Sequence, residues 1–508
     1  MGLTACEAVV RTPAAMTGGA NPTNHETESL GNRVRNAVIW RSGSQMLAQM
    51  VQWAATFLVI RILSPGDYGL FAMTGVVLVF LNMLNGYGLA SGLIRREAVT
   101  PFEIRQLFGM LILLNATLGI AQLALAPLAA AYYRQPIVAD LLRAQALLYL
   151  TTPFIALPYA LLSRAMDFRH QARTNIVASM ASAATALGGA LMGWGVWTLV
   201  AAPMALFTIR AVMLTWSARS LIRPSFRFRG AGHLARYGGV MAAGQLFWFL
   251  QSQVDVFIAG RHFSPHLLGI YTTSLFLTQI FVAKFVPPLN EVAFSAYARI
   301  RHDERAVAQA FVRSVRIIFV VAMPFYLGLA ATAEPLVLAV LGEKWREAVP
   351  VVRLLALAMP FMTMQVLYAP ACDARGHPGI GVRNGAAGAV VLGVAFLVGV
   401  RWGVTGMGWA WIAAYPLYLA ISTWRSLPVI GARVRDLADA VAPSALAALA
   451  MAVIVRLLDL TLPPLDPVWR LAALIAVGTV IYTAWLAAFA RPTIRELGSL
   501  IRKRPLST

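Results

Sequence analysis

The chain has 508 residues, of which 59% are hydrophobic and only 12% are charged. A soluble globular domain is about 25% charged, so this composition predicts an integral membrane protein. The net charge of +21 does not indicate nucleic-acid binding, because the basic residues lie in short links between apolar runs and not on one solvated face.

The chain begins with a polar segment and continues as a series of apolar ones. Residues 1–35 lack an apolar core long enough for a signal peptide, so we expect a disordered cytoplasmic tail there. A bilayer core of about 30 Å needs roughly 20 apolar residues per helix. Segments of this length predict an all-α protein with about fourteen transmembrane helices. Their centres fall near residues 52, 80, 117, 152, 183, 207, 248, 280, 318, 358, 390, 413, 447 and 479.

A repeated motif divides these helices into two copies. The sequence RILSPGDYGLF at residues 61–71 returns as RHFSPHLLGIY at residues 261–271. Internal repeats of helical bundles are common in transporters. We therefore expect two six-helix lobes in parallel repeat and a terminal helix pair. The expected order after the tail is an N-terminal lobe at 36–219, a basic cytoplasmic link at 220–236, a C-terminal lobe at 237–426, the helix pair at 437–490 and a basic cytoplasmic tail at 491–508.

Basic residues alternate between the links. Of the 42 Lys and Arg, about thirty fall in the two termini and the even-numbered links, and about ten fall in the odd-numbered links. By the positive-inside rule, both termini of this multi-pass protein are cytoplasmic. Six helices per copy is an even number, so both lobes enter the membrane in the same orientation.

Polar side chains follow one face of the first predicted helix. Gln45, Gln49 and Gln52 recur at steps of three and four, with Arg41 at the inner end of the helix. Other polar residues within predicted helices are Asn82, Asn85, Gln245, Ser252 and Asp255. Such residues line a water-filled path or join helices through hydrogen bonds. Three glutamines on one face, echoed in the second copy, favour a path.

Lys284 is a charge placed deep within a predicted helix. Counting back from Arg299 at about 1.5 Å per residue puts it roughly 20 Å from the inner link, too far for the lysine stem to reach the interface. It needs water, an anionic ligand or an acidic partner on a neighbouring helix. Asp255 is expected at another depth, near the outer end of its helix, where it either carries a proton or cation or caps a polar cluster.

Motifs of enzymes and metal proteins are missing from the sequence. It has no GxxxxGK[ST] phosphate loop, no paired-carboxylate motif set in a long loop and no G-x-S-x-G elbow. Cys6 and Cys372 are its two cysteines, too few for a disulfide framework or a zinc site. We expect no cofactor, no metal and no catalytic residue.

Four segments carry a resemblance to a known family. Residues 63–70 (LSPGDYGL) and 86–96 (GYGLASGLIRR) resemble the first hairpin of bacterial lipopolysaccharide and exopolysaccharide flippases. These form the polysaccharide transporter branch of the multidrug/oligosaccharidyl-lipid/polysaccharide exporter superfamily. Residues 161–169 and 341–345 are similar to two further link elements of that branch. The long tail and Ser163, where the family has Gln, depart from its pattern.

The resemblance implies a flippase, not an enzyme. Its substrate would be an undecaprenyl-diphosphate-linked oligosaccharide repeat unit, moved across the bacterial inner membrane for exopolysaccharide or lipopolysaccharide export. A diphosphate cannot cross about 30 Å of hydrocarbon alone, so we expect alternating access of the two lobes around a central polar, cationic cavity. Arg41 and Lys284 are candidates for binding the diphosphate, and Asp255 for ion coupling. Candidates for binding the sugars are Gln45, Gln49, Gln52, Asn82, Asn85, Gln245 and Ser252.

Two other functions remain as alternatives. A drug/cation antiporter of the same superfamily would share the fold, but it should prefer buried carboxylates, and the chain has only 21 acidic residues. A membrane-embedded polysaccharide polymerase or ligase generally needs a large outer loop, whereas the outer links here are short. Expected partners are the lipid-linked substrate, membrane lipid, and the polymerase and export machinery of a polysaccharide pathway.

Overall fold

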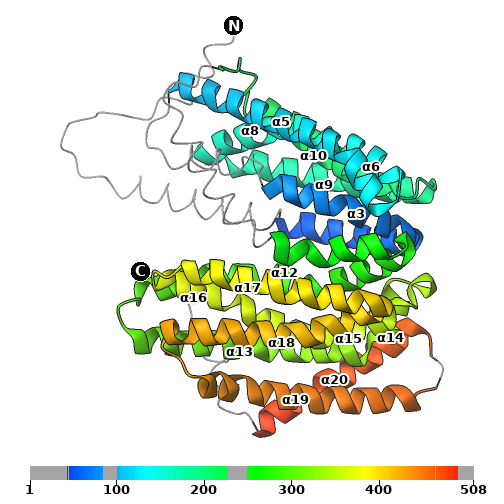
Figure 1. Cartoon of the computed structure of the whole chain (residues 1–508), viewed down its shortest axis with the longest axis vertical. Helices are drawn as coiled ribbons and strands as arrows, with labels where there is room; N and C mark the ends of the chain where they lie inside the picture. Colours follow the sequence, from blue (N-terminus) through cyan, green and yellow to red (C-terminus); the bar gives the residue numbers. More distant parts are fainter. Residues whose placement is uncertain are drawn as a thin grey trace. The chain divides into compact units, whose positions relative to one another are not determined.

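The computed structural model describes residues 43, 45–83, 100–165, 167–226, 249–463 and 465–489. Within these ranges the secondary structure is helical, and no residue is assigned to a strand. The chain divides into two compact units, residues 1–246 and residues 247–508 (Figure 1).

The number of membrane-crossing helices agrees with the sequence prediction. Eleven helical runs among the described residues are long and apolar enough to cross a membrane. One run, Gly379–Ile430, contains two helices joined by a single 3-10 turn. Splitting it and adding the helices described at 45–62 and 249–262 brings the total to fourteen, so the prediction of an all-α membrane protein with about fourteen helices is confirmed.

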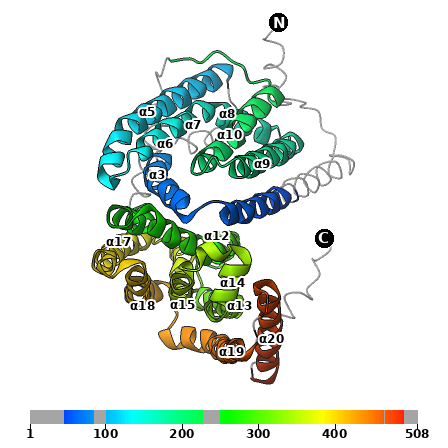
Figure 2. The same ribbon diagram turned by 90° about the vertical axis from the view of Figure 1, so that its right-hand side faces the viewer.

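Unit 1 packs its helices pairwise, with α9 against α10 and α5 against α6 (Figure 2). Its fourth predicted span consists of three short helices, α6 to α8, within the run Ile137–Arg164. Pro153 stands at the start of α8, where its lack of an N–H interrupts the helical hydrogen bonds. The helices of unit 1 are 45–62, α3 (Pro65–Met83), α5 (Pro101–Tyr133), α6 (Ile137–Ala146), α7 (Leu148–Thr151), α8 (Pro153–Arg164), α9 (Phe168–Leu191) and α10 (Trp197–Ser217).

Unit 2 is built around α12, α15 and α18, and α13 packs against α15 and α19. Two short elements, α14 and η1, lie in the link before α15. The elements of unit 2 are the helix at 249–262, α12 (Pro265–Arg299), α13 (Glu304–Ala331), α14 (Ala333–Val340), η1 (Glu343–Trp345), α15 (Ala348–Val366), α16 (Tyr368–Ala374), α17 (Gly379–Gly399), η2 (Val400–Trp402), α18 (Gly403–Ile430), α19 (Val434–Thr461) and α20 (Pro467–Phe489).

The repeated motif forms the same turn in both units. The N–H of Leu63 donates to the carbonyl of Val59 at 2.9 Å, and that of Phe263 donates to Ala259 at 2.8 Å. The serine that follows each of them accepts a hydrogen bond from the backbone N–H three residues later, at 3.3 Å in unit 1 and 3.4 Å in unit 2. Proline then begins the next helix in each unit, where its missing N–H is not needed.

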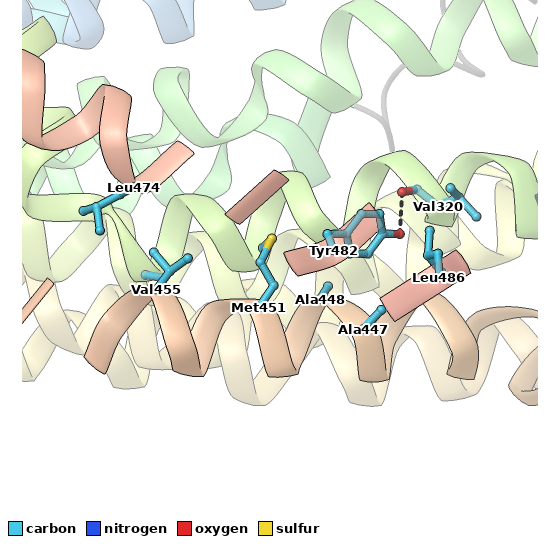
Figure 3. Close-up of a cluster of buried hydrophobic side chains, with 9 residues drawn as sticks. Val320, Ala447, Ala448, Met451, Val455, Leu474, Tyr482 and Leu486 are labelled. Carbon is cyan, nitrogen blue, oxygen red and sulfur yellow. Dashed lines mark hydrogen bonds between the residues drawn. The ribbon is translucent and has the colours of Figure 1, made fainter. Parts of the chain in front are cut away.

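The last two helices of unit 2 pack against α13 through a buried apolar cluster (Figure 3). The hydroxyl of Tyr482 on α20 donates to the backbone carbonyl of Val320 on α13 at 2.7 Å, within this cluster. Small side chains on α19 let the helices approach closely. The buried members of the cluster are Val320, Ala331, Ala447, Ala448, Met451, Val455, Leu474, Tyr482 and Leu486.

Large apolar side chains point outward from both units. Leu128 is 65% exposed, Trp424 76% and Val480 65%. A soluble protein rarely leaves so many such residues in water, whereas hydrocarbon surroundings favour them. The exposed apolar faces therefore agree with a position in the bilayer.

Candidate functional site

The glutamines of the first helix follow one face of helix 45–62. The side chain of Gln45 is exposed, and those of Gln49 and Gln52 are half-buried. None of the three amides has a hydrogen-bond partner among the described residues. The hydroxyl of Thr56, on the same face, donates to the backbone carbonyl of Gln52 at 2.7 Å. The three amides therefore join no helices within the described structure.

Three other candidates, Arg41, Asn85 and Gln245, lie outside the described residues. Asn82 is exposed one residue before the end of α3. The hydroxyl of Ser252 donates to the carbonyl of Phe249 on its own helix at 3.2 Å. Asn82 thus presents its amide at the surface of unit 1, while Ser252 is engaged locally.

Lys284 lies near the middle of α12, the longest helix described. This helix has 35 residues, and at about 1.5 Å per residue it is about 52 Å long, more than the bilayer core of about 30 Å. The side chain of Lys284 is exposed, and it forms no ion pair with a described carboxylate. An acidic partner on a neighbouring helix, one of the alternatives for this residue, is therefore absent from the described part of unit 2.

Asp255 is held inside unit 2 by a chain of hydrogen bonds. Its side chain is buried, with 3% of the residue exposed. The hydroxyl of Tyr271 on α12 donates to Oδ2 of Asp255 at 2.8 Å, and the indole Nε1–H of Trp411 on α18 donates to the Tyr271 oxygen at 2.8 Å. The second carboxylate oxygen, Oδ1, has no hydrogen-bond partner in the described structure. The chain therefore orients one oxygen and leaves the other available.

A second set of hydrogen bonds lies beside the first. The hydroxyl of Tyr418 on α18 donates to Oε1 of Gln251 at 3.3 Å, and Nε2 of Gln365 on α15 donates to the Tyr418 oxygen at 2.6 Å. Gln251 and Asp255 are four residues apart, so they share one face of helix 249–262. This face meets α18, and we call the group of Gln251, Asp255, Tyr271, Gln365, Trp411 and Tyr418 the unit 2 polar cluster.

Aromatic rings on α18 support this cluster. Trp411 and Tyr415 stack with centroids 4.8 Å apart and an angle of 10° between their planes, and Tyr415 meets Tyr418 edge to face at 6.1 Å. A Cβ at Gly388 of α17 would lie 2.7 Å from Cζ of Tyr418. Glycine at this position is what allows the Tyr418 ring to reach the cluster.

Asp255 and Lys284 lie at different depths, in agreement with the expectation from the sequence. Asp255 is seven residues from the end of helix 249–262, or about 10 Å at 1.5 Å per residue. Lys284 is nineteen residues beyond Pro265, the start of α12, or about 28 Å. Since the two helices are joined by a short turn, the carboxylate and the ammonium group do not meet.

Sequence reasoning missed most of the polar cluster. Two signals were present: Tyr271 stands where the first copy of the repeat has Phe71, and the aromatic residues 411, 415 and 418 follow the spacing of one helix face. Among the described residues, no three His, Cys, Asp or Glu side chains converge in a way that could hold a metal ion.

Comparisons with known proteins agree with this architecture. A family model described as "Polysaccharide biosynthesis protein" matches residues 58–350, more than half of the chain. The succinoglycan biosynthesis transport protein ExoT of Rhizobium meliloti (strain 1021) is 27% identical over 466 residues, which cover 88% of this chain and 91% of that protein. The teichuronic acid biosynthesis protein TuaB of Bacillus subtilis (strain 168) is 22% identical over 331 residues, 65% of this chain and 68% of that protein.

A solved structure shares the fold. The lipid II flippase MurJ in an inward closed conformation aligns with a TM-score of 0.73 at 12% identity, over 90% of this chain and 100% of that chain. At this identity the likeness concerns the fold alone.

Proposed function

Because the chain belongs to the polysaccharide biosynthesis protein family, we propose that it is a flippase for undecaprenyl-diphosphate-linked oligosaccharide repeat units. It acts in the bacterial inner membrane with both termini in the cytoplasm, and it supplies repeat units for export as exopolysaccharide or lipopolysaccharide. Its relatives ExoT and TuaB are named for succinoglycan transport and teichuronic acid biosynthesis, which supports this class of substrate.

The position of Lys284 is the observation on which this proposal rests. An ammonium group near the middle of a transmembrane helix is costly unless water or an anion meets it. The side chain is exposed and has no carboxylate partner among the described residues. A diphosphate passing through the membrane needs such a cation, because its own charge would otherwise be desolvated. Lys284 therefore binds the diphosphate during transport, and Arg41 is proposed for the same role.

Polar residues of the two units are proposed to bind the sugars. Amides donate and accept hydrogen bonds at once, which suits hydroxyl groups that do both. The amides of Gln45, Gln49 and Gln52 on one helix face have no partner among the described residues and offer this chemistry, and Asn82, Asn85, Gln245 and Ser252 are proposed to extend it. The lipid tail needs no polar partner and stays in the hydrocarbon.

The unit 2 polar cluster couples transport to an ion. A single buried carboxylate with one oriented and one available oxygen suits a proton or a monovalent cation. Binding of the ion to Asp255 changes the charge inside unit 2. The two charge states favour different conformations, so binding and release of the ion drive alternating access of the two units. Asp255 is the residue we propose to carry that ion.

A drug/cation antiporter is less well supported. The buried side chains of the described residues include two carboxylates, Asp255 and Asp459, and Asp459 is already paired with two arginines. A pocket for organic cations would need more negative charge.

Complementation with variants of Lys284 tests the proposal. In a strain that lacks the protein, Lys284→Ala should lower surface polymer by roughly tenfold or more, since a charge-assisted contact to the diphosphate is lost. Lys284→Arg keeps the positive charge and should restore part of the export. Arg401→Ala, at an exposed arginine, is the matched control. Unchanged export by Lys284→Ala at normal membrane abundance would remove Lys284 from the substrate path.

A further inference from the structure

The end of α19 and the start of α20 share one buried carboxylate in unit 2. The side chain of Asp459, near the end of α19, has 0% exposure. Nη1 of Arg456 lies 2.9 Å from Oδ2 of Asp459, and Nε of Arg470 on α20 lies 2.7 Å from Oδ1. Nη2 of Arg470 also donates to the backbone carbonyl of Asp459 at 3.3 Å. Two guanidinium groups therefore share a single carboxylate.

A third guanidinium group lies close to these two. Nε of Arg353 on α15 donates to the backbone carbonyl of Ala330 at 3.4 Å. Ala330 is the second-last residue of α13. Arg353 is half-buried, and α13 packs against α19, the helix that carries Arg456 and Asp459. Its two terminal nitrogens have no acceptor among the described residues. Glu334 on α14 accepts a hydrogen bond from Nη1 of Arg346 at 3.2 Å.

Holding the terminal helices in place does not require three arginines. The apolar cluster in Figure 3 already docks α19 and α20 on α13, and one arginine would neutralise Asp459. A half-buried guanidinium group without an anionic partner carries a desolvation cost. Each guanidinium has five N–H donors, and Arg353 and Arg456 use one each toward described residues. The remaining donors have no acceptor among the described residues, so an anion can bind to them.

We propose that Arg353 and Arg456 bind the phosphate of a lipid headgroup, with Asp459 and Arg470 as positioning residues. Planar guanidinium groups bind phosphate oxygens through paired hydrogen bonds. The ends of α13, α15, α19 and α20 place the group at the membrane surface, where headgroups lie. In the orientation proposed above, this is the outer leaflet. The phosphate belongs either to a phospholipid or to the polyprenyl carrier, and this site goes beyond the substrate path assigned to Lys284.

Lipid retention by the purified full-length protein tests this site. The protein is incubated with phosphatidylglycerol, undecaprenyl phosphate or uncharged diacylglycerol, and bound lipid is counted by native mass spectrometry. Wild-type protein should retain the two phosphate lipids above the diacylglycerol background. Arg353→Gln, which leaves both Asp459 ion pairs intact, should lower that retention several-fold, and Arg353→Gln with Arg456→Gln should lower it about tenfold or more.

Arg401→Gln is the matched control, because it removes an exposed arginine from the same end of unit 2. Loss of both phosphate lipids in the Arg353 variants supports a general headgroup site, and loss of undecaprenyl phosphate alone supports a carrier site. Equal retention by wild type and Arg353→Gln overturns the proposal, as does an equal loss in Arg401→Gln. Lipid retention is measured without transport, so its result does not depend on whether the protein is a flippase.

Discussion

The hydroxyl of Tyr271 donates a 2.8 Å hydrogen bond to the carboxylate of Asp255 inside unit 2. The same hydroxyl oxygen accepts the indole N–H of Trp411, so a single phenol joins three helices. A buried carboxylate held by neutral donors and not by an arginine keeps the freedom to bind and release a cation or proton. Asp255 differs in this respect from Asp459, which two arginines neutralise.

Replacing Tyr271 by Phe should destabilise unit 2. The change leaves Oδ2 of Asp255 and Nε1 of Trp411 without their partners, and an unpaired buried polar group costs about 1–3 kcal/mol. Thermal unfolding in detergent should show a lower midpoint for Tyr271→Phe. Tyr159→Phe is the control, because the Tyr159 hydroxyl has no hydrogen-bond partner among the described residues. Equal midpoints for the two variants would contradict the role of the phenol.

Replacing Asp255 by Asn should uncouple transport while the fold is kept. The amide can still accept the hydrogen bond from Tyr271, but it cannot carry a charge or exchange a proton at neutral pH. Export by wild type should respond to an imposed ion gradient, and export by Asp255→Asn should not. If the variant remains as dependent on the gradient as wild type, another residue carries the ion.

Replacing Gln45, Gln49 and Gln52 together by Leu should reduce export. Each amide offers hydrogen bonds to sugar hydroxyls worth about 0.5–1.5 kcal/mol, so the triple variant should lose roughly tenfold or more in transport. Thr56→Val removes a hydroxyl that bonds its own helix and should leave transport nearly unchanged. Normal polymer in the triple variant would exclude this helix face from sugar binding.

Replacing Gly388 by Ala should disturb the Tyr418 ring. The new methyl group would lie 2.7 Å from Cζ of Tyr418, and overpacking of this kind costs about 1–3 kcal/mol. Gly381→Ala on the same helix meets no atom within 4 Å and should be neutral or slightly stabilising. Thermal unfolding compares the two directly, and equal stability of both variants would mean that Tyr418 moves aside without cost.

The helices were predictable because length and hydropathy are properties of single segments. A run of apolar residues must span the bilayer wherever it packs, so the fourteen helices followed from the sequence alone. Breaks within a predicted helix were harder to predict from the sequence. Pro153 is visible as a helix breaker, yet the division of its span into three short helices depends on packing. Likewise, α12 continues to Arg299 through Pro287 and Pro288 without a break.

The hydrogen-bond partners within the unit 2 polar cluster could not be predicted from the sequence. Asp255 is visible as an acid in an apolar segment, but its partners Tyr271 and Trp411 lie 16 and 156 positions away. An aromatic residue in an apolar helix faces lipid or core equally well, and only the packing of α12 and α18 against helix 249–262 selects the partner. The glutamine face of helix 45–62 was predictable because its members are local in sequence.

The most direct test of flippase function is the location of lipid-linked repeat units in a strain that lacks this protein. We predict that surface polymer is lost and that completed units accumulate on the inner leaflet, where they remain protected from a reagent added outside. Units that still reach the outer leaflet but remain unpolymerised would contradict a flippase and favour a polymerase or ligase. No change in either pool would contradict transport of lipid-linked sugars altogether.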